Sequence, residues 1–111
     1  MTTPANKLQK KVLDTLIKNG VFAWRQNNMP VYDPKLHNGY GGYRTHQGLK
    51  GVPDIIAIIN GRFVGIEIKA GRDRMSADQL LFKKRCERHG GLYFVVKRIE
   101  DLSPVLELTK P

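Results

Sequence analysis

The pair Asn60-Gly61 constrains this chain more than any other two residues. It stands between two runs rich in isoleucine and valine, residues 52–59 and 62–69. Asn-Gly between apolar runs favours a two-residue turn, because both positions of that turn need positive φ angles. Such a turn fixes the pairing, so that the numbers of opposite residues add up to 121, as 60 and 61 do. The sequence therefore predicts a β-hairpin with one register.

This register brings three ionisable residues together at the open end of the hairpin. Asp54 lies directly opposite Glu67, and Lys69 lies two residues further along. Opposed residues, and residues two apart, share one face of a sheet. The other positions are apolar, with Ile56, Ile58, Phe63 and Gly65 on the charged face and Ile55, Ala57, Ile59, Val64, Ile66 and Ile68 on the opposite face. We therefore expect both faces to be covered, as in the central strands of a sheet.

The facing carboxylates of Asp54 and Glu67 need a compensating interaction. Cβ atoms directly across a ladder lie about 5 Å apart, and at an effective dielectric of about 20 the repulsion is ~3 kcal/mol. That is a large share of a small domain's stability. One carboxylate can stay protonated, Lys69 can form a salt-bridge cluster, or a divalent cation can bridge the pair. Carboxylate oxygens indicate Mg²⁺ or Mn²⁺ rather than zinc.

The charge of the chain indicates a polyanionic partner. Its 111 residues include 19 Lys and Arg against 10 Asp and Glu, a net charge of +9. Nucleic acid is the first candidate partner, an anionic membrane surface is the second, and a basic protein without a specific partner is the alternative. We expect no membrane span, since no run of 18 apolar residues occurs. The single Cys86 excludes an intramolecular disulfide and fits a reducing cytoplasm.

Residues 1–111 predict a single α/β domain. Apolar periodicity and turn signals predict helices over residues 4–18, 77–89 and 101–108 and strands over 21–25, 52–59, 62–69 and 92–97. The glycine-rich segment 27–51 is long for a loop in a compact domain, and such loops are often functional. It can contain a hairpin around Gly41-Gly42. The predicted order gives a mixed sheet flanked by helices.

The sequence between Pro53 and Lys69 resembles the PD-(D/E)xK nuclease superfamily, through Pro53-Asp54 and Glu67-Ile68-Lys69. More narrowly, residues 5 to 108 resemble the VRR-NUC family, through GVPDIIAI, GIEIKAG, SADQ, HGGLYFVV and a closing IEDL. The resemblance implies a restriction-endonuclease-like αβββαβ core, in which a central mixed β-sheet is flanked by helices. It also implies a metal-dependent DNA endonuclease that hydrolyses phosphodiester bonds with Mg²⁺ or Mn²⁺.

The resemblance assigns roles to the charged cluster. Asp54 and Glu67 hold the metal, and the backbone carbonyl of Ile68 is a third ligand. Lys69 positions or helps to activate the attacking water and stabilises the developing negative charge.

Each of two glutamines, Gln79 and Gln9, has more than one possible role. Gln79 completes a capping box with Ser76, which explains both residues structurally, whereas the family pattern places Gln79 beside the active site as a catalytic residue. The family usually carries a glutamate on the first helix, where this chain offers Asn6 and Gln9. The amide oxygen of Gln9 can bind the metal or orient a metal-bound water.

Several residues near the predicted site are candidates for DNA contacts. The cations that flank it in the sequence, and that can contact phosphates, are Arg25, Arg44, Lys50, Arg72 and Arg74. Tyr40 and Tyr43 can stack on unpaired bases, or they can pack within their own loop.

The resemblance implies a stand-alone nuclease of the phage or bacterial type, in the cytoplasm of a bacterium or of a phage-infected host. Its substrate would be branched DNA, such as a Holliday junction or a flap. One site cuts one strand, so cutting two strands favours a homodimer. The alternatives are a non-catalytic DNA-binding module that retains the nuclease fold, and an endonuclease of the restriction or archaeal-resolvase type.

Overall fold

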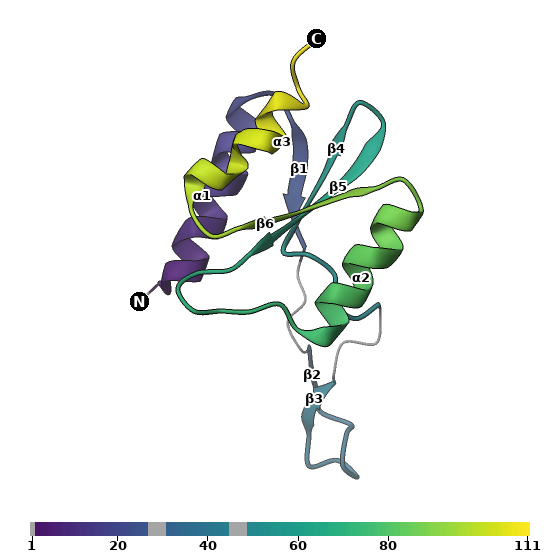
Figure 1. Cartoon of the computed structure of the whole chain (residues 1–111). Coiled ribbons are helices and arrows are strands. Elements are labelled where there is room, and N and C mark those ends of the chain that lie inside the picture. Colours follow the sequence, from purple (N-terminus) through teal and green to yellow (C-terminus); the bar gives the residue numbers. More distant parts are fainter. Residues whose placement is uncertain (1, 27–30, 45–48) are drawn as a thin grey trace.

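The main sheet has four strands in the order β1-β4-β5-β6 (Figure 1). The computed structural model describes residues 2–26, 31–44 and 49–111. The strands are β1 Phe22–Arg25, β4 Ile55–Ile59, β5 Arg62–Ile68 and β6 Leu92–Val96. Strand β4 is antiparallel to both of its neighbours, β1 and β5, and β6 is parallel to β5. The prediction of a mixed α/β sheet flanked by helices is confirmed.

Helices cover the two faces of this sheet unequally. On one face lie α1 (Pro4–Lys18) and α3 (Ser103–Glu107), which follows a 3₁₀ turn at Ile99–Leu102, and on the other lies α2 (Ala77–Arg88) (Figure 1). The α1 helix begins at the predicted cap, where Thr3 Oγ1 accepts a hydrogen bond from the Asn6 N–H at 3.1 Å. Within the described ranges, no helix has the length and apolar character that crossing a membrane requires.

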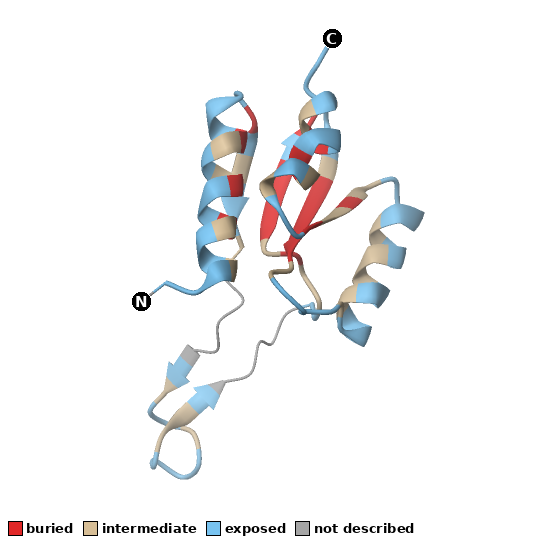
Figure 2. Cartoon of the chain, turned by 60° about the vertical axis from the view of Figure 1, so that its left-hand side comes forward, coloured by how far each residue is buried: buried red, intermediate tan, exposed pale blue. Residues whose placement is uncertain are grey.

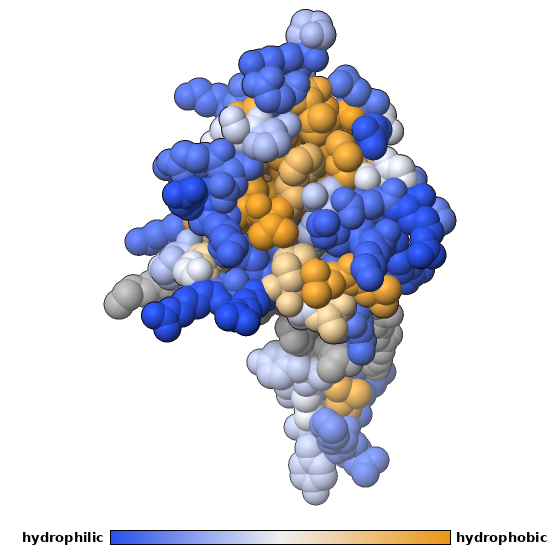
Figure 3. Space-filling model, viewed as in Figure 1, coloured by the Kyte–Doolittle hydropathy of each residue, from blue (hydrophilic) through white to orange (hydrophobic). Residues whose placement is uncertain are grey.

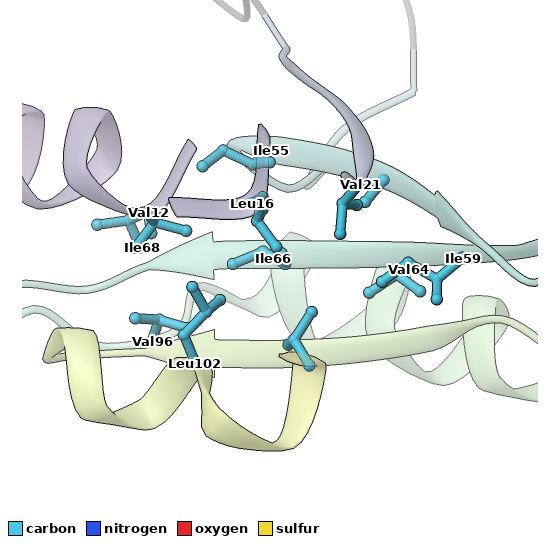
Figure 4. Close-up of a cluster of buried hydrophobic side chains, with 12 residues drawn as sticks. Val12, Leu16, Val21, Ile55, Ile59, Val64, Ile66, Ile68, Val96 and Leu102 are labelled. Carbon is cyan, nitrogen blue, oxygen red and sulfur yellow. The ribbon is translucent and has the colours of Figure 1, made fainter. Parts of the chain in front are cut away.

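The hydrophobic core lies between the sheet and the layer formed by α1 and α3. Figure 4 shows Val12 and Leu16 of α1 and Leu102 of the 3₁₀ turn directed at Ile55, Ile66 and the other inward residues of the sheet. The helix residues Val12, Leu16 and Val105 are fully buried. In Figure 2 the buried residues accordingly concentrate on the central strands and on the inner sides of these helices. Figure 3 shows hydrophilic side chains over both flanks of the molecule, with a band of hydrophobic atoms between them.

The central hairpin has the predicted register. Ile55 pairs with Ile66 and Ile59 with Arg62, around a turn in which Asn60 and Gly61 have φ angles of 54° and 77°. Strand β4 begins three residues later than expected, at Ile55. The chain stays beside β1 before that point, because the Gln26 N–H donates to the carbonyl oxygen of Asp54 at 2.8 Å.

The expectation that both faces of the hairpin are covered is confirmed on the inward face and on most of the charged face, where Ile56 and Glu67 are buried, and is wrong at Ile58. The inward face is buried throughout, whereas Ile58 is 38% exposed. Beside it on β1, Phe22 is 69% and Trp24 36% exposed, and their rings are 5.2 Å apart. The physical reason is the position of α2, which packs against β6 and, through Phe82, against Phe63. It leaves the end of the sheet formed by β1 and β4 uncovered.

A second, two-stranded sheet projects away from the main one (Figures 1 and 2). It consists of β2 (Val31–Asp33) and β3 (Gly42–Arg44), with Tyr32 paired to Tyr43. The suggested hairpin within residues 27–51 therefore forms, but Gly42 begins a strand and the turn comprises residues 34–41. We call residues 31–44 the tyrosine arm.

Candidate functional site

Asp54 is held in place by backbone geometry on both sides of the hairpin. The Ile68 N–H donates to Asp54 Oδ2 at 2.8 Å, across the open end of the β4–β5 pair. The preceding Pro53 is fully buried against Gly65, where a Cβ atom would lie 2.8 Å from the proline Cγ. Any side chain at position 65 of β5 would therefore displace the segment that carries Asp54. These contacts fix the carboxylate opposite Glu67.

Glu67 is the centre of the site and is only 3% exposed. Its Oε1 accepts a hydrogen bond from Gln79 Nε2 at 3.0 Å and lies 3.9 Å from Lys69 Nζ. Its Oε2 accepts a longer hydrogen bond, at 3.5 Å, from the hydroxyl of Tyr93. The structure therefore brings together four of the residues that the sequence suggested, because Asp54 also contacts the Glu67 carboxyl group.

The pKa of Glu67 is raised to about 8, mainly by burial. The charge of Asp54 and a hydrogen bond with its carboxyl group contribute to this increase. Lys69 and the Tyr93 hydroxyl lower the pKa, but their effects are smaller. The pKa of Tyr93 is raised as well, mainly by burial, so its hydroxyl remains a donor. Proton uptake by Glu67 and the nearby Lys69 ammonium group are two of the three compensations expected for the carboxylate pair.

Gln79 combines the two roles that the sequence left as alternatives. The side-chain Oε1 of Gln79 accepts a hydrogen bond from the Ser76 backbone N–H at 2.9 Å. The backbone N–H of Gln79 donates to Ser76 Oγ at 3.2 Å, which completes the capping box. The side-chain nitrogen Nε2 of Gln79 remains available and donates to Glu67 Oε1. The first turn of α2 can lie this close because Gly51 has no side chain, and a Cβ atom there would overlap the Asp78 carbonyl oxygen. The capping box therefore also orients a polar group toward the carboxylates.

A cavity of about 350 Å³ opens at these carboxylates. It is lined by Leu49, Lys50, Gly51, Val52, Asp54, Glu67, Ser76, Asp78 and Gln79. In the described part of the chain, no group of three or more His, Cys, Asp or Glu side chains is placed to hold a metal ion. A cation here would rely on two carboxylates, a carbonyl or amide oxygen and water. That donor set fits Mg²⁺ or Mn²⁺, which commonly bind through one or two carboxylates and retain several waters.

Gln9 does not line the cavity that holds Asp54 and Glu67. It lines a separate cavity of about 270 Å³, together with Asn6 and Arg25 among others. The side chain is 8% exposed, and its Oε1 accepts no hydrogen bond from any group in the described ranges. Gln9 as a metal ligand therefore stays a prediction without support from the lining of the main cavity.

The predicted DNA-binding cations are distributed around the site. Lys50 lines the carboxylate cavity, whereas Arg25 lines the cavity of Gln9. Arg72 and Arg74 are exposed in the loop between β5 and α2. Arg44 lies in β3, and its side chain is outside the described part of the structure.

Tyr93 is the site residue that the sequence did not suggest. It reaches Glu67 because β6 runs parallel to β5, with Tyr93 beside Gly65 and Val95 beside Glu67. No local turn connects these two strands, so no feature of the sequence fixes their register. The only available signal was a single polar group within the apolar run Leu92–Val96.

Comparison with known proteins adds no family assignment. No protein-family model matches the chain, and no curated protein matches it either. The resemblance to the VRR-NUC family therefore stays a hypothesis.

Proposed function

We propose that this protein is a metal-dependent DNA endonuclease that hydrolyses phosphodiester bonds, with a VRR-NUC-like αβββαβ core. One observation carries the proposal: Asp54 contacts a buried Glu67, whose pKa is raised to about 8, beside Lys69 and at the wall of an open cavity. A purely structural ion pair has little reason to leave two carboxyl groups together at a cavity, because their repulsion costs stability. Perturbed ionisable groups in a cleft are typical of functional sites.

Each residue has a defined task in this proposal. Asp54 and Glu67 would hold Mg²⁺ or Mn²⁺, with the Ile68 carbonyl as a further ligand. When bound, such a cation would supply a water of lowered pKa and would neutralise charge on the phosphate. Lys69 stabilises the negative charge that develops on the phosphate, and Gln79 holds Glu67 Oε1 through its amide.

The net charge of +9 supports DNA as the partner. Lys50 lines the cavity, and the exposed Arg72 and Arg74 precede α2, so these cations can contact phosphates on either side of the scissile bond. Arg25 and Arg44 are further candidates. We place the activity in the cytoplasm of a bacterium or of a phage-infected host cell.

The uncovered end of the sheet supports a homodimer. Phe22, Trp24 and Ile58 form an exposed apolar patch on β1 and β4, and β1 is an edge strand. Exposed apolar patches often mark interaction sites, and a two-fold axis there would give two cleavage sites for branched DNA. A measured solution mass of one chain would remove this part of the proposal.

Cleavage of a set of DNA substrates tests the activity. Blunt duplex, flap, splayed and four-way DNA are incubated with Mg²⁺ or Mn²⁺, and we expect a branched substrate to be cut fastest. Lys69→Ala should reduce cleavage by about two to three orders of magnitude while DNA binding is retained. Lys110→Ala is the matched control, because Lys110 forms an exposed pair with Glu107 and should leave the rate unchanged.

The same experiment decides between the rival functions. Absence of cleavage on every substrate would favour the non-catalytic DNA-binding module, for which the neutral Asn6 and Gln9 on the first helix are the supporting observation. Preference for a short duplex sequence would favour the restriction type, and preference for four-way junctions the resolvase type. Asp54→Asn and Glu67→Gln should each remove activity, and wild-type rates in these variants would refute the site assignment.

A further inference from the structure

The tyrosine arm has its own internal order. Tyr32 and Tyr43 are cross-strand partners with ring centroids 5.5 Å apart in an edge-to-face arrangement. The Tyr32 hydroxyl packs over Gly41, where a Cβ atom would overlap it. The Asp33 side chain is engaged within the turn, since its Oδ1 accepts from the Lys35 N–H at 2.9 Å. The arm therefore presents a defined surface.

The aromatic rings of the arm are largely in solvent. Tyr40 is 90% exposed, Tyr43 69% and Tyr32 56%. Tyrosine rings are large and apolar apart from their hydroxyl groups, so a folded protein usually buries much of their area. Three such rings within 14 residues contribute little to the core and are accessible to a partner.

The described residues that flank the arm in the sequence contact or line the wall of the carboxylate cavity. On the N-terminal side, the Gln26 N–H donates to the carbonyl oxygen of Asp54. On the C-terminal side, Leu49 and Lys50 line the cavity. Figures 1 and 2 show that the arm projects away from the main sheet. A polymer bound in the cavity and leaving it on this side would meet the tyrosines.

We propose that the tyrosine arm binds unpaired nucleotides of the DNA substrate, whose bases stack on Tyr40 and Tyr43. This inference rests on the proposed nuclease function and names its substrate class: DNA with an unpaired segment beside the bond that is cut. Aromatic rings on a basic surface bind single strands without sequence preference, because every base offers a π-face. Bases within a duplex already stack on each other and cannot use these rings. Lys35 and Lys50 supply charges of the sign that the phosphates require.

The test measures binding without cleavage, in EDTA and with the full-length chain. The probes are a single-stranded oligonucleotide, a flap with an unpaired arm and a blunt duplex, each with one 2-aminopurine. Stacking on a tyrosine should quench 2-aminopurine in the unpaired positions and leave the duplex signal unchanged. Tyr40→Ala and Tyr43→Ala should each weaken binding of the unpaired probes about tenfold, abolish the quenching and spare duplex binding.

Matched variants separate stacking from other causes. Tyr40→Phe and Tyr43→Phe keep the ring and should bind like the wild type, because stacking does not use the hydroxyl group. Leu81→Ala removes another exposed apolar side chain, from α2, and should change nothing. Circular dichroism of each variant confirms that the fold is retained.

Three results would overturn the inference. The alanine variants could bind unpaired DNA as tightly as the wild type, or they could lose duplex binding to the same extent. The double variant Tyr40→Ala with Tyr43→Ala could lower the solution mass, in which case a second copy of the chain is the partner of the arm. None of these results depends on cleavage, so a failure of the nuclease proposal, seen as no cleavage with Mg²⁺ or Mn²⁺, remains distinguishable.

Discussion

Two β-hairpins in the described part of the chain have opposite properties. The β4–β5 hairpin has a two-residue turn, and its inward residues, such as Ile55 and Ile66, are fully buried. The tyrosine arm has a turn of eight residues, strands of three residues and rings that are mostly exposed. The first hairpin forms the centre of the sheet and carries the carboxylates. The second extends from the region of the same cavity into solvent.

This difference shows how the chain separates stability from recognition. Burial of the aliphatic face stabilises β4–β5 enough to tolerate two adjacent carboxyl groups, one of them almost inaccessible to water. The arm buries little and so contributes little to folding, but its tyrosine rings are exposed and accessible to a ligand. Precise positioning of chemical groups is easier on a buried hairpin, and access to a large substrate is easier on an exposed one.

Shortening a buried side chain on the core side of the β4–β5 hairpin should have the largest effect on stability. Ile66 is fully buried, so Ile66→Ala removes buried apolar surface and leaves a cavity. We expect the free energy of unfolding to fall by about 2–5 kcal/mol, measured by urea denaturation followed by circular dichroism. Tyr43→Ala in the arm is the counterpart and should cost less than about 1 kcal/mol. Equal losses of stability in the two variants would contradict the claim that the β4–β5 hairpin stabilises the fold more than the tyrosine arm does.

The buried carboxyl group should make the stability of the protein depend on pH. The pKa of Glu67 is about 8 in the folded protein, against 4.5 for an ordinary glutamate, so folding takes up a proton between these values. The stabilisation is complete below pH 4.5 and is lost as the pH rises through 8. In EDTA, the free energy of unfolding should therefore fall by roughly 2–4 kcal/mol between pH 5 and pH 9, as urea titrations would measure. The neutral isostere in Glu67→Gln should flatten this dependence.

A divalent cation should reverse the trend, because it binds the ionised form of Glu67. Added Mg²⁺ or Mn²⁺ should raise the unfolding midpoint more at pH 9 than at pH 6. The matched substitution Glu107→Gln, on the exposed side of α3, should retain both the pH dependence and the response to metal. A pH dependence that persists in Glu67→Gln would show that another group is responsible.

The two hairpins also differ in how far the sequence predicted them. Asn60-Gly61 encodes a turn type, and alternation of side chains across that turn placed Asp54 opposite Glu67 with no further information. In the arm, the turn is long and the strands are short, so neither a turn type nor a period is visible in the sequence. The sequence suggests a hairpin there, but around Gly41-Gly42, and in the structure Gly42 begins a strand.

Contacts between distant segments were the least predictable part of the site. Tyr93 reaches Glu67 only through the parallel register of β5 and β6, which depends on packing across the connecting helix rather than on a turn. Coverage of the charged face near Ile58 also depends on where α2 lies, and no local pattern in the sequence indicates that position. Gln79 was suggested for two separate reasons, and the geometry shows that its oxygen and nitrogen serve different partners.

Gln79→Ala should have an intermediate effect that connects helix capping to the carboxylates. It removes half of the capping box and the donor to Glu67, and we expect a loss of about 1 kcal/mol in the free energy of unfolding. Thr3→Ala removes the cap of α1, far from the carboxylates in the chain, at a similar cost. Only Gln79→Ala should also reduce the stabilisation that Mg²⁺ or Mn²⁺ provides at pH 9. Equal responses of both variants to metal would show that Gln79 acts as a cap alone.

Removal of the Tyr40 ring should have the smallest effect on stability. The Tyr40 side chain lies in the turn of the arm and is 90% exposed. Tyr40→Ala should therefore change the free energy of unfolding by no more than about 0.5 kcal/mol. The measurement is the same urea titration, with Tyr40→Phe as the control. A loss above about 1 kcal/mol would mean that the ring packs against the folded protein in solution. The arm would then belong to the structural core, and its tyrosines would not be available for unpaired bases.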